Sequence, residues 1–119
     1  MNQGQKLRNP DADHVPTPRW FAVLYDGWFD PCPLGSISFL EPDLQNPKIF
    51  INPGYSRVDE AVERAIDWHK RGFIVHLLIP IESSTKRAKK LIQYGCQRLY
   101  FEKRIYENVR GVELVVLTG

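Results

Sequence analysis

Four consecutive residues, Asn52-Pro53-Gly54-Tyr55, bring together groups from which a ligand site can be built. A side-chain amide, a rigid proline and an aromatic ring follow a short apolar run, residues 48–51, and precede an amphipathic segment. The run predicts a strand, and open α/β sheets bind their ligands just beyond the carboxyl ends of such strands. Ordinary turns also use this composition, so the tetrapeptide by itself leaves a ligand site and a simple strand-to-helix turn both open.

The segments around the tetrapeptide predict a strand, a helix and a second strand. The helix starts at Ser56, which forms an approximate capping box with Asp59, and it ends before Gly72. Residues 73–80 form an uninterrupted apolar run of the kind found in central parallel strands. Two parallel strands joined by a helix make a right-handed βαβ unit. The helix face expected to be buried comprises Val58, Ala61, Val62, Ala65, Ile66 and His69.

Two proline-containing segments precede this unit. Thr17-Pro18 is a helix start, a hydroxyl cap followed by proline at the first helical position, and it predicts a short, largely buried helix over residues 18–25. Residues 28–33 predict a strand that two prolines stop and that places Asp30 at the sheet edge. The alternative for Asp30 is a residue that caps a turn.

The C-terminal half predicts one more helix and two strands. Ser83-Ser84-Thr85 caps a helix that ends at Gly95. Its inward residues are Ala88, Leu91 and Ile92. The two strands, residues 97–102 and 112–117, follow each other without a helix, so we expect them to pair antiparallel. The whole pattern predicts an α/β fold with a mostly parallel sheet, an antiparallel C-terminal strand and helices on the faces.

Positive charge is concentrated in the same half of the chain. Eight of the sixteen Lys and Arg residues lie between Lys86 and Arg110, with only two acidic residues among them. A basic helix can bind the phosphates of nucleic acid, and the alternative is an ordinary solvated face. The candidate phosphate contacts are Lys86, Arg87, Lys90 and Arg104. The net charge of the whole chain, +2, neither requires nor excludes such a partner.

Composition predicts a single globular domain. The chain has 119 residues, of which 43% are hydrophobic and 25% charged. We expect one domain over residues 14–119, preceded by a flexible polar tail over residues 1–13. No apolar run approaches the length of a membrane span, and no signal-peptide core is present, so we expect a cytoplasmic protein.

Other side chains with reactive groups have structural interpretations. Cys32 and Cys96 are expected at opposite edges of the sheet, too far apart for a disulfide, and neither belongs to a metal-binding spacing. His76 lies in the middle of an apolar strand and is predicted to be a hydrogen-bonded core residue rather than a catalyst.

In their order and spacing, four segments resemble the phage-type, Dam-like DNA adenine N6-methyltransferases. These segments are Thr17-Pro18, Asp30-Pro31-Cys32-Pro33, Ile51-Asn52-Pro53-Gly54-Tyr55-Ser56 and Leu77-Leu78-Ile79-Pro80. The likeness runs from about His14 to the C-terminus. Its most specific part is the amino-methyltransferase signature, Asp or Asn, then Pro-Pro, then an aromatic residue. Gly54 stands where the second proline is expected, which makes the turn less rigid.

The resemblance implies catalytic roles for Asn52, Pro53 and Tyr55. The exocyclic amine of adenine is a poor nucleophile because its lone pair is conjugated with the ring. Carbonyl oxygens of Asn52 and Pro53 that accept its N–H groups would stabilise the positive charge of the transition state. Tyr55 would stack on the base after it is flipped out of the duplex. Such a reaction depends mainly on positioning and needs no metal.

The resemblance also implies S-adenosylmethionine as cofactor, bound by Thr17, Pro18, Asp30 and Pro31. It implies a truncated, Rossmann-like methyltransferase sheet, DNA as the partner and, for a viral enzyme, the host cytoplasm as the location. An edge strand could pair two copies into a homodimer. Two alternatives stay open: a non-catalytic relative that binds nucleic acid or serves in assembly, and methylation of another amine or amide, such as an RNA base or a glutamine side chain.

Overall fold

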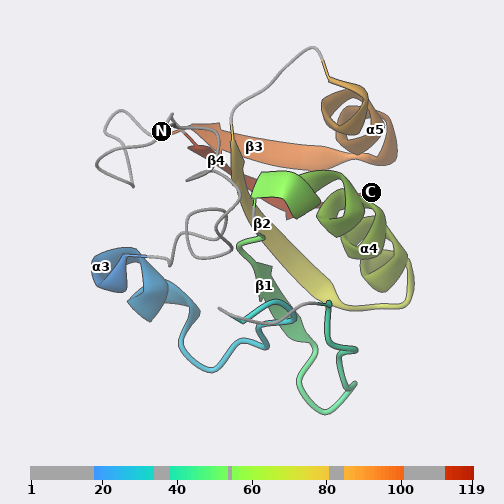
Figure 1. The fold of residues 1–119 in the computed structure, drawn as a ribbon. Helices are drawn as coiled ribbons and strands as arrows, with labels where there is room; N and C mark the ends of the chain where they lie inside the picture. Colours follow the sequence, from blue (N-terminus) through green and yellow to red (C-terminus); the bar gives the residue numbers. More distant parts are fainter. Residues whose placement is uncertain (1–17, 34–37, 54, 81–84, 101–111) are drawn as a thin grey trace.

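A computed structural model describes residues 18–33, 38–53, 55–80, 85–100 and 112–119. In this part of the chain a four-stranded sheet carries α4 and α5 on one face and the short α3 on the other (Figure 1). The α/β class is therefore confirmed. With η denoting a 3-10 helix, the elements in chain order are α3 (Arg19–Ala22), η1 (Val23–Tyr25), β1 (Lys48–Ile51), η2 (Tyr55–Arg57), α4 (Val58–Lys70), β2 (Ile74–Pro80), α5 (Lys86–Tyr94), β3 (Cys96–Tyr100) and β4 (Val112–Leu117).

The sheet is mixed, with the strand order β1-β2-β4-β3. β1 and β2 pair in parallel, whereas β4 pairs antiparallel with both β2 and β3. The antiparallel pairing of the last two strands is confirmed. The sheet is only partly parallel, whereas a mostly parallel sheet was predicted, because β4 lies between β2 and β3 and pairs antiparallel with both. β1, β2 and β3 still run in the same direction.

α4 connects the two parallel strands, as predicted. It begins at Val58 rather than at Ser56, because the preceding residues form the 3-10 turn η2 and the N-cap position falls on Arg57. His69 is only half-buried, whereas Trp68, which was not predicted to face inward, is buried. The buried residues of α4 are Val58, Ala61, Val62, Ala65, Ile66 and Trp68.

α5 is capped at its start by Thr85, whose Oγ1 accepts a hydrogen bond from the Ala88 N–H at 3.3 Å. Ala88 and Leu91 are buried as expected, but Ile92 is 55% exposed. The prediction for Ile92 is wrong because one step along a helix turns the side chain by about 100°, away from the sheet. The helix ends at Gly95, whose φ of 114° is open to glycine but not to most residues.

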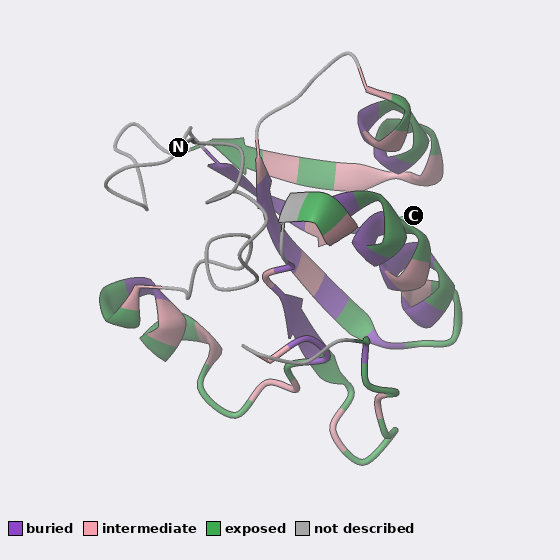
Figure 2. Cartoon of the chain, in the orientation of Figure 1, coloured by how far each residue is buried: buried purple, intermediate pink, exposed green. Residues whose placement is uncertain are grey.

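Each face of the sheet carries its own hydrophobic cluster. Ile49 and Leu77 face α4 and α5, whereas Phe50 and Leu78 face Phe21 of α3. This division follows from the alternation of side chains along a strand. Figure 2 shows the buried residues along the central strands and on the sheet-facing side of α4.

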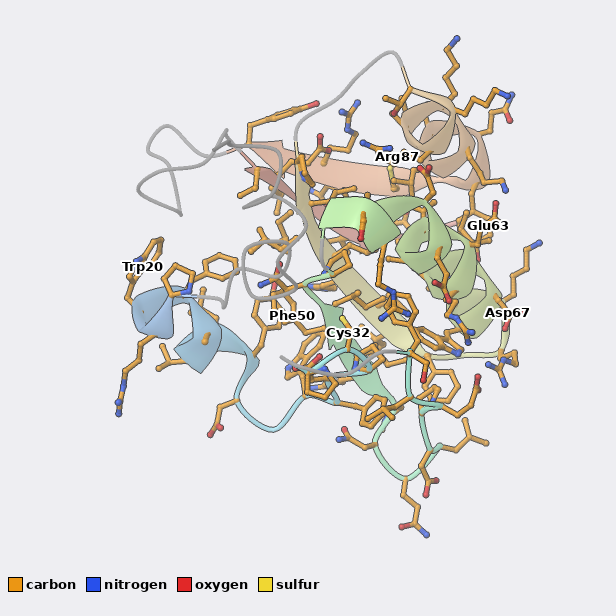
Figure 3. All side chains as sticks on the ribbon, in the orientation of Figure 1. Trp20, Cys32, Phe50, Glu63, Asp67 and Arg87 are labelled. Carbon is orange, nitrogen blue, oxygen red and sulfur yellow. The ribbon has the colours of Figure 1, made fainter. Side chains whose placement is uncertain are left out.

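The first helix is shorter and more exposed than predicted. Residues 18–25 contain four residues of α-helix followed by a 3-10 turn. Phe21 is buried, but Trp20, Val23 and Leu24 are 62%, 60% and 65% exposed. A helix that lies on one face of a sheet buries only one side, and here apolar residues surround it. Figure 3 shows Trp20 on α3, at the margin of the molecule.

Residues 28–33 do not form the predicted strand. Only Phe29 makes a β-type contact, a single parallel bridge to Ile49 of β1. The chain turns directly afterwards, because Pro31 and Pro33 have no N–H groups for a longer ladder.

Candidate functional site

β1 ends directly before the predicted signature. Ile51 is the last residue of the strand, and Asn52 and Pro53 follow it. Asn52 is half-buried and Pro53 is buried. These two residues therefore leave the sheet at the carboxyl end of β1, where the sequence predicts a site. Gly54 and the side chain of Tyr55 lie outside the part of the chain that the structure describes.

A second segment meets this one through the Phe29 bridge. The Phe29 N–H donates to the Lys48 carbonyl at 2.8 Å, and the Phe50 N–H donates to the Phe29 carbonyl at 3.0 Å. The bridge pairs Phe29 with Ile49 in parallel. In a parallel pairing both chains advance in the same direction. Residues 30–32 therefore emerge beside the end of β1.

Asp30 caps the turn in this second segment. Its Oδ1 accepts a hydrogen bond from the Cys32 N–H at 3.0 Å, which is an Asx turn. The Pro31 carbonyl accepts a hydrogen bond from the Leu40 N–H at 2.7 Å, so the long connection is tied to the same turn. Pro31 is buried and Asp30 is exposed. The turn-capping interpretation of Asp30 is confirmed, and the turn holds its carboxylate at the surface near the end of β1.

Cys32 links the two segments. It is 3% exposed and belongs to the cluster beneath α4 (Figure 3). Burial and then the Asp30 carboxylate raise the pKa of Cys32 to about 12, while a hydrogen bond from the Asn52 backbone and the charge of Arg57 act in the opposite direction. The thiol therefore stays protonated at neutral pH. It lies close to both Asn52 and Arg57. Cys32 was not among the predicted site residues, although it lies within the Asp30-Pro31-Cys32-Pro33 segment of the resemblance.

Arg57 adds a fixed positive charge where α4 begins. Its guanidinium carbon lies 4.1 Å from the ring centre of Phe39, which is buried, and this cation–π contact orients the group. Its Nη2 also lies 3.4 Å from the Glu60 carboxylate. Arg57 was not among the residues predicted from the sequence, although its position directly after the signature could have suggested it.

Two of the candidate phosphate contacts on α5 interact with α4. Arg87 Nη1 lies 2.9 Å from Asp59 Oδ1, and the Lys90 ammonium pairs with Glu63. Figure 3 shows Arg87 and Glu63 on the side of the molecule where α4 and α5 lie. These pairs dock α5 against α4 and partly neutralise the positive charge of its face.

The remaining predicted site residues lie elsewhere. Lys86 is exposed in the first turn of α5. Pro18 occupies the N-cap position of α3, on the opposite face of the sheet from α4, and its carbonyl accepts a hydrogen bond from the Ala22 N–H at 2.8 Å. Thr17 and Arg104 lie outside the described residues.

His76 is a hydrogen-bonded residue of the α3 face, as predicted. Its Nδ1 lies 2.9 Å from the Tyr25 hydroxyl, and its ring centre lies 4.8 Å from that of Trp28. Burial lowers the pKa of His76 and raises the pKa of Tyr25 to about 12. Both groups are therefore mainly neutral near pH 7, which suits a structural pair.

A small cavity lies between α5 and the strands β2, β3 and β4. Its volume is about 10 Å³, room for about one water molecule. The lining residues are Ile79, Pro80, Arg87, Ala88, Leu91, Arg98 and Glu113. This space cannot hold a nucleoside-sized ligand.

No group of three or more His, Cys, Asp or Glu side chains in the described ranges is arranged to hold a metal ion. None of the helices described is long and apolar enough to cross a membrane. Comparisons with protein-family models, curated proteins and solved structures found no match for the chain. Its function is therefore inferred from its motifs and from the geometry at the end of β1.

Proposed function

We propose that the chain is an S-adenosylmethionine-dependent methyltransferase that acts on the N6 amine of adenine in DNA. One juxtaposition carries the proposal. The Asp-Pro-Cys and Asn-Pro segments, which are distant in the sequence, lie side by side at the carboxyl end of β1, joined by the bridge of Phe29 and by the contact of Cys32 with Asn52. Open α/β sheets bind their ligands at this end.

Asn52 and Pro53 supply the groups that an amine substrate requires. The Asn52 side-chain carbonyl and the Pro53 backbone carbonyl accept its N–H groups, which favours a tetrahedral nitrogen and stabilises the positive charge that develops there. Both residues follow the last residue of a paired strand, so their backbone is held by the sheet before substrate binds. Acceptors fixed in advance stabilise a transition state with little reorganisation. Tyr55 stacks on the flipped base.

Asp30 fits the cofactor side of the same site. An exposed carboxylate, held by its turn, accepts hydrogen bonds from the ammonium or hydroxyl groups of S-adenosylmethionine. When bound, this cofactor supplies a methyl group on a sulfonium centre. Of the other residues that the resemblance implies for the cofactor, Pro31 belongs to the same turn as Asp30, whereas Pro18 lies at the start of α3 and Thr17 lies outside the described residues.

DNA phosphates are the proposed ligands of the basic residues. Arg87 and Lys90 on α5 pair with carboxylates of α4 in the free protein. When DNA binds, they exchange these carboxylates for phosphates, because ion pairs to exposed carboxylates are weak. Arg57 adds a positive charge two residues after Tyr55, the last of the proposed adenine-binding residues. The proposed phosphate contacts are Lys86, Arg87, Lys90 and Arg104.

Cofactor binding is the first prediction. We expect the protein to bind S-adenosylmethionine and S-adenosylhomocysteine in calorimetric titration, and we expect Asp30→Ala to weaken this binding by about tenfold or more, since hydrogen bonds to charged groups are worth about 1.5–3 kcal/mol. Asp43→Ala is the matched control, because Asp43 Oδ1 caps a comparable turn by accepting from the Gln45 N–H at 3.0 Å. Equal losses in the two variants would show that the loss in Asp30→Ala does not report a contact between Asp30 and the cofactor.

Methyl transfer to DNA tests the activity itself. We expect methyl groups from the cofactor to appear on N6 of adenine, and we expect Asn52→Ala to lower kcat by about 10²–10³, as for other preorganised hydrogen-bonding groups in catalytic sites. If the protein binds DNA but binds neither S-adenosylmethionine nor S-adenosylhomocysteine, the proposed function is wrong. The chain would then be a non-catalytic nucleic-acid-binding protein.

A further inference from the structure

We propose that Cys32 is a positioning residue: its buried sulfur accepts a hydrogen bond from the Asn52 backbone N–H and so holds the first residue of the signature in place. The hydrogen bond itself does not depend on the proposed function, whereas its importance for catalysis rests on that function.

The register of the Phe29 bridge explains why a sulfur lies where it can accept the Asn52 N–H. Since Phe29 pairs with Ile49 and its carbonyl accepts the Phe50 N–H, a continued parallel ladder would direct the Asn52 N–H to the Pro31 carbonyl. That carbonyl accepts the Leu40 N–H at 2.7 Å, so it is already engaged by the long connection.

The same register brings Cys32 level with Asn52. The Asx turn of Asp30 fixes the backbone of Cys32 beside Asn52, and the Cys32 side chain is buried in the cluster beneath α4. The hydrogen bond from the Asn52 backbone to this thiol follows from that placement. A sulfur therefore serves as an acceptor for Asn52 at the point where the ladder stops.

The environment of the thiol suits an acceptor and excludes a nucleophile. Cys32 is 3% exposed, and burial keeps its pKa near 12, so the reactive thiolate is absent at neutral pH. A neutral sulfur that is fixed in a packed cluster can hold a backbone N–H without adding charge beside a site that develops positive charge.

Two substitutions separate hydrogen bonding from packing. Cys32→Ser keeps an acceptor but is smaller than cysteine, whereas Cys32→Val fills the space but cannot accept a hydrogen bond. If Cys32 positions Asn52, amide hydrogen exchange at Asn52 should be about tenfold faster in Cys32→Val than in wild type, and nearer wild type in Cys32→Ser. The Phe50 amide, which donates to Phe29, is the internal control and should be unchanged in both variants.

Methyl-transfer kinetics on adenine-containing DNA test whether this hydrogen bond matters for catalysis. We expect Cys32→Val to lower kcat by about tenfold while the affinity for S-adenosylmethionine changes little, and we expect Cys32→Ser to restore part of kcat. Unchanged exchange at Asn52 in Cys32→Val would overturn the hydrogen bond whether or not the protein methylates DNA. Faster exchange with unchanged kcat would overturn the catalytic role. If the wild type transfers no methyl group, the proposed function and this role in catalysis both fail, while exchange at Asn52 still decides the hydrogen bond.

Discussion

At the scale of single residues, His76 and Tyr25 form a neutral pair inside the α3 face of the sheet. The Tyr25 ring stacks on Phe50 with 4.0 Å between ring centres, and its hydroxyl reaches His76 Nδ1. Burial lowers the pKa of His76 below its ordinary value of 6.5. Protonation of His76 is therefore more favourable in the unfolded chain than in the folded protein.

We predict that His76 makes the folded state less stable as the pH falls. Above pH 6.5 the histidine is mostly neutral in both states, but at lower pH the unfolded chain binds a proton first. The free energy of unfolding then decreases until the pH passes below the folded-state pKa. Urea unfolding of the wild type and of His76→Phe at about pH 7.5 and about pH 5.5 checks this, and the wild type should lose more stability.

Tyr25→Phe is the control for this prediction. It keeps the titrating histidine, so it should lose stability with falling pH as the wild type does. Removal of the hydroxyl should add a loss of about 1 kcal/mol where the histidine is neutral. Parallel pH curves for the wild type and His76→Phe would contradict the assignment to His76.

At the scale of elements, a buried ion pair joins β3 to β4. Arg98 Nε and Nη2 lie 2.6 and 2.9 Å from the two carboxylate oxygens of Glu113. The Arg98 side chain is 17% exposed and that of Glu113 3%, and the hydrogen bonds raise the pKa of Arg98. Arg98 lies opposite Val115 and therefore diagonal to Glu113 on the same face. The pair thus favours one register of the two strands.

We predict that Arg98→Met destabilises the protein by about 3–5 kcal/mol, because it leaves the Glu113 carboxylate buried without its partner. The double variant Arg98→Met with Glu113→Leu should recover most of this loss, since apolar side chains of similar size often replace a buried ion pair without cost. Urea unfolding at neutral pH measures both.

The control is Arg87→Met, which breaks the pair with Asp59, whose side chain is 80% exposed. Pairs this close to solvent contribute at most about 1 kcal/mol. If Arg98→Met lowers the free energy of unfolding no more than Arg87→Met does, another group stabilises the Glu113 carboxylate when Arg98 is absent.

At the scale of the whole molecule, β2 and β4 form the centre of the sheet. Each is paired along both edges. Among the described residues, β1 has only the Phe29 bridge on its outer side and β3 pairs with β4 alone. Leu77 pairs with Val115, and neither residue is exposed at all. The most stable hydrogen bonds should therefore lie between these two strands, although their residues are far apart in the sequence.

We predict that the amides of Leu77, Leu78, Leu114 and Val115 are among the slowest to exchange with deuterated water. Opening them requires separation of the central strands, which approaches global unfolding. The amide of Leu99 on β3 should exchange at least about tenfold faster. Equal protection on β3 would indicate that this strand is covered or paired along its outer edge, for example by a second copy of the chain.

Much of the local structure was predictable, because it depends on short stretches of chain. The apolar run of β1, the helical spacing of α4, the Thr85 cap and the stop at Gly95 are all read within one turn or one strand. The Asn52 segment was placed correctly at the end of β1 for the same reason. The proximity of Cys32 to Asn52 could not be predicted, because it depends on the register of the Phe29 bridge with Ile49 of β1.

The sequence by itself determined where most helices and strands lie and which strand delivers Asn52, since side-chain periodicity, caps and glycine stops act locally. Only the tertiary structure decided that β4 inserts between β2 and β3, that Trp20 stays exposed and that Arg98 meets Glu113. Periodicity shows which face of an element is apolar, but not which neighbour covers it. Strand order and register are set by hydrogen bonds and packing between distant segments.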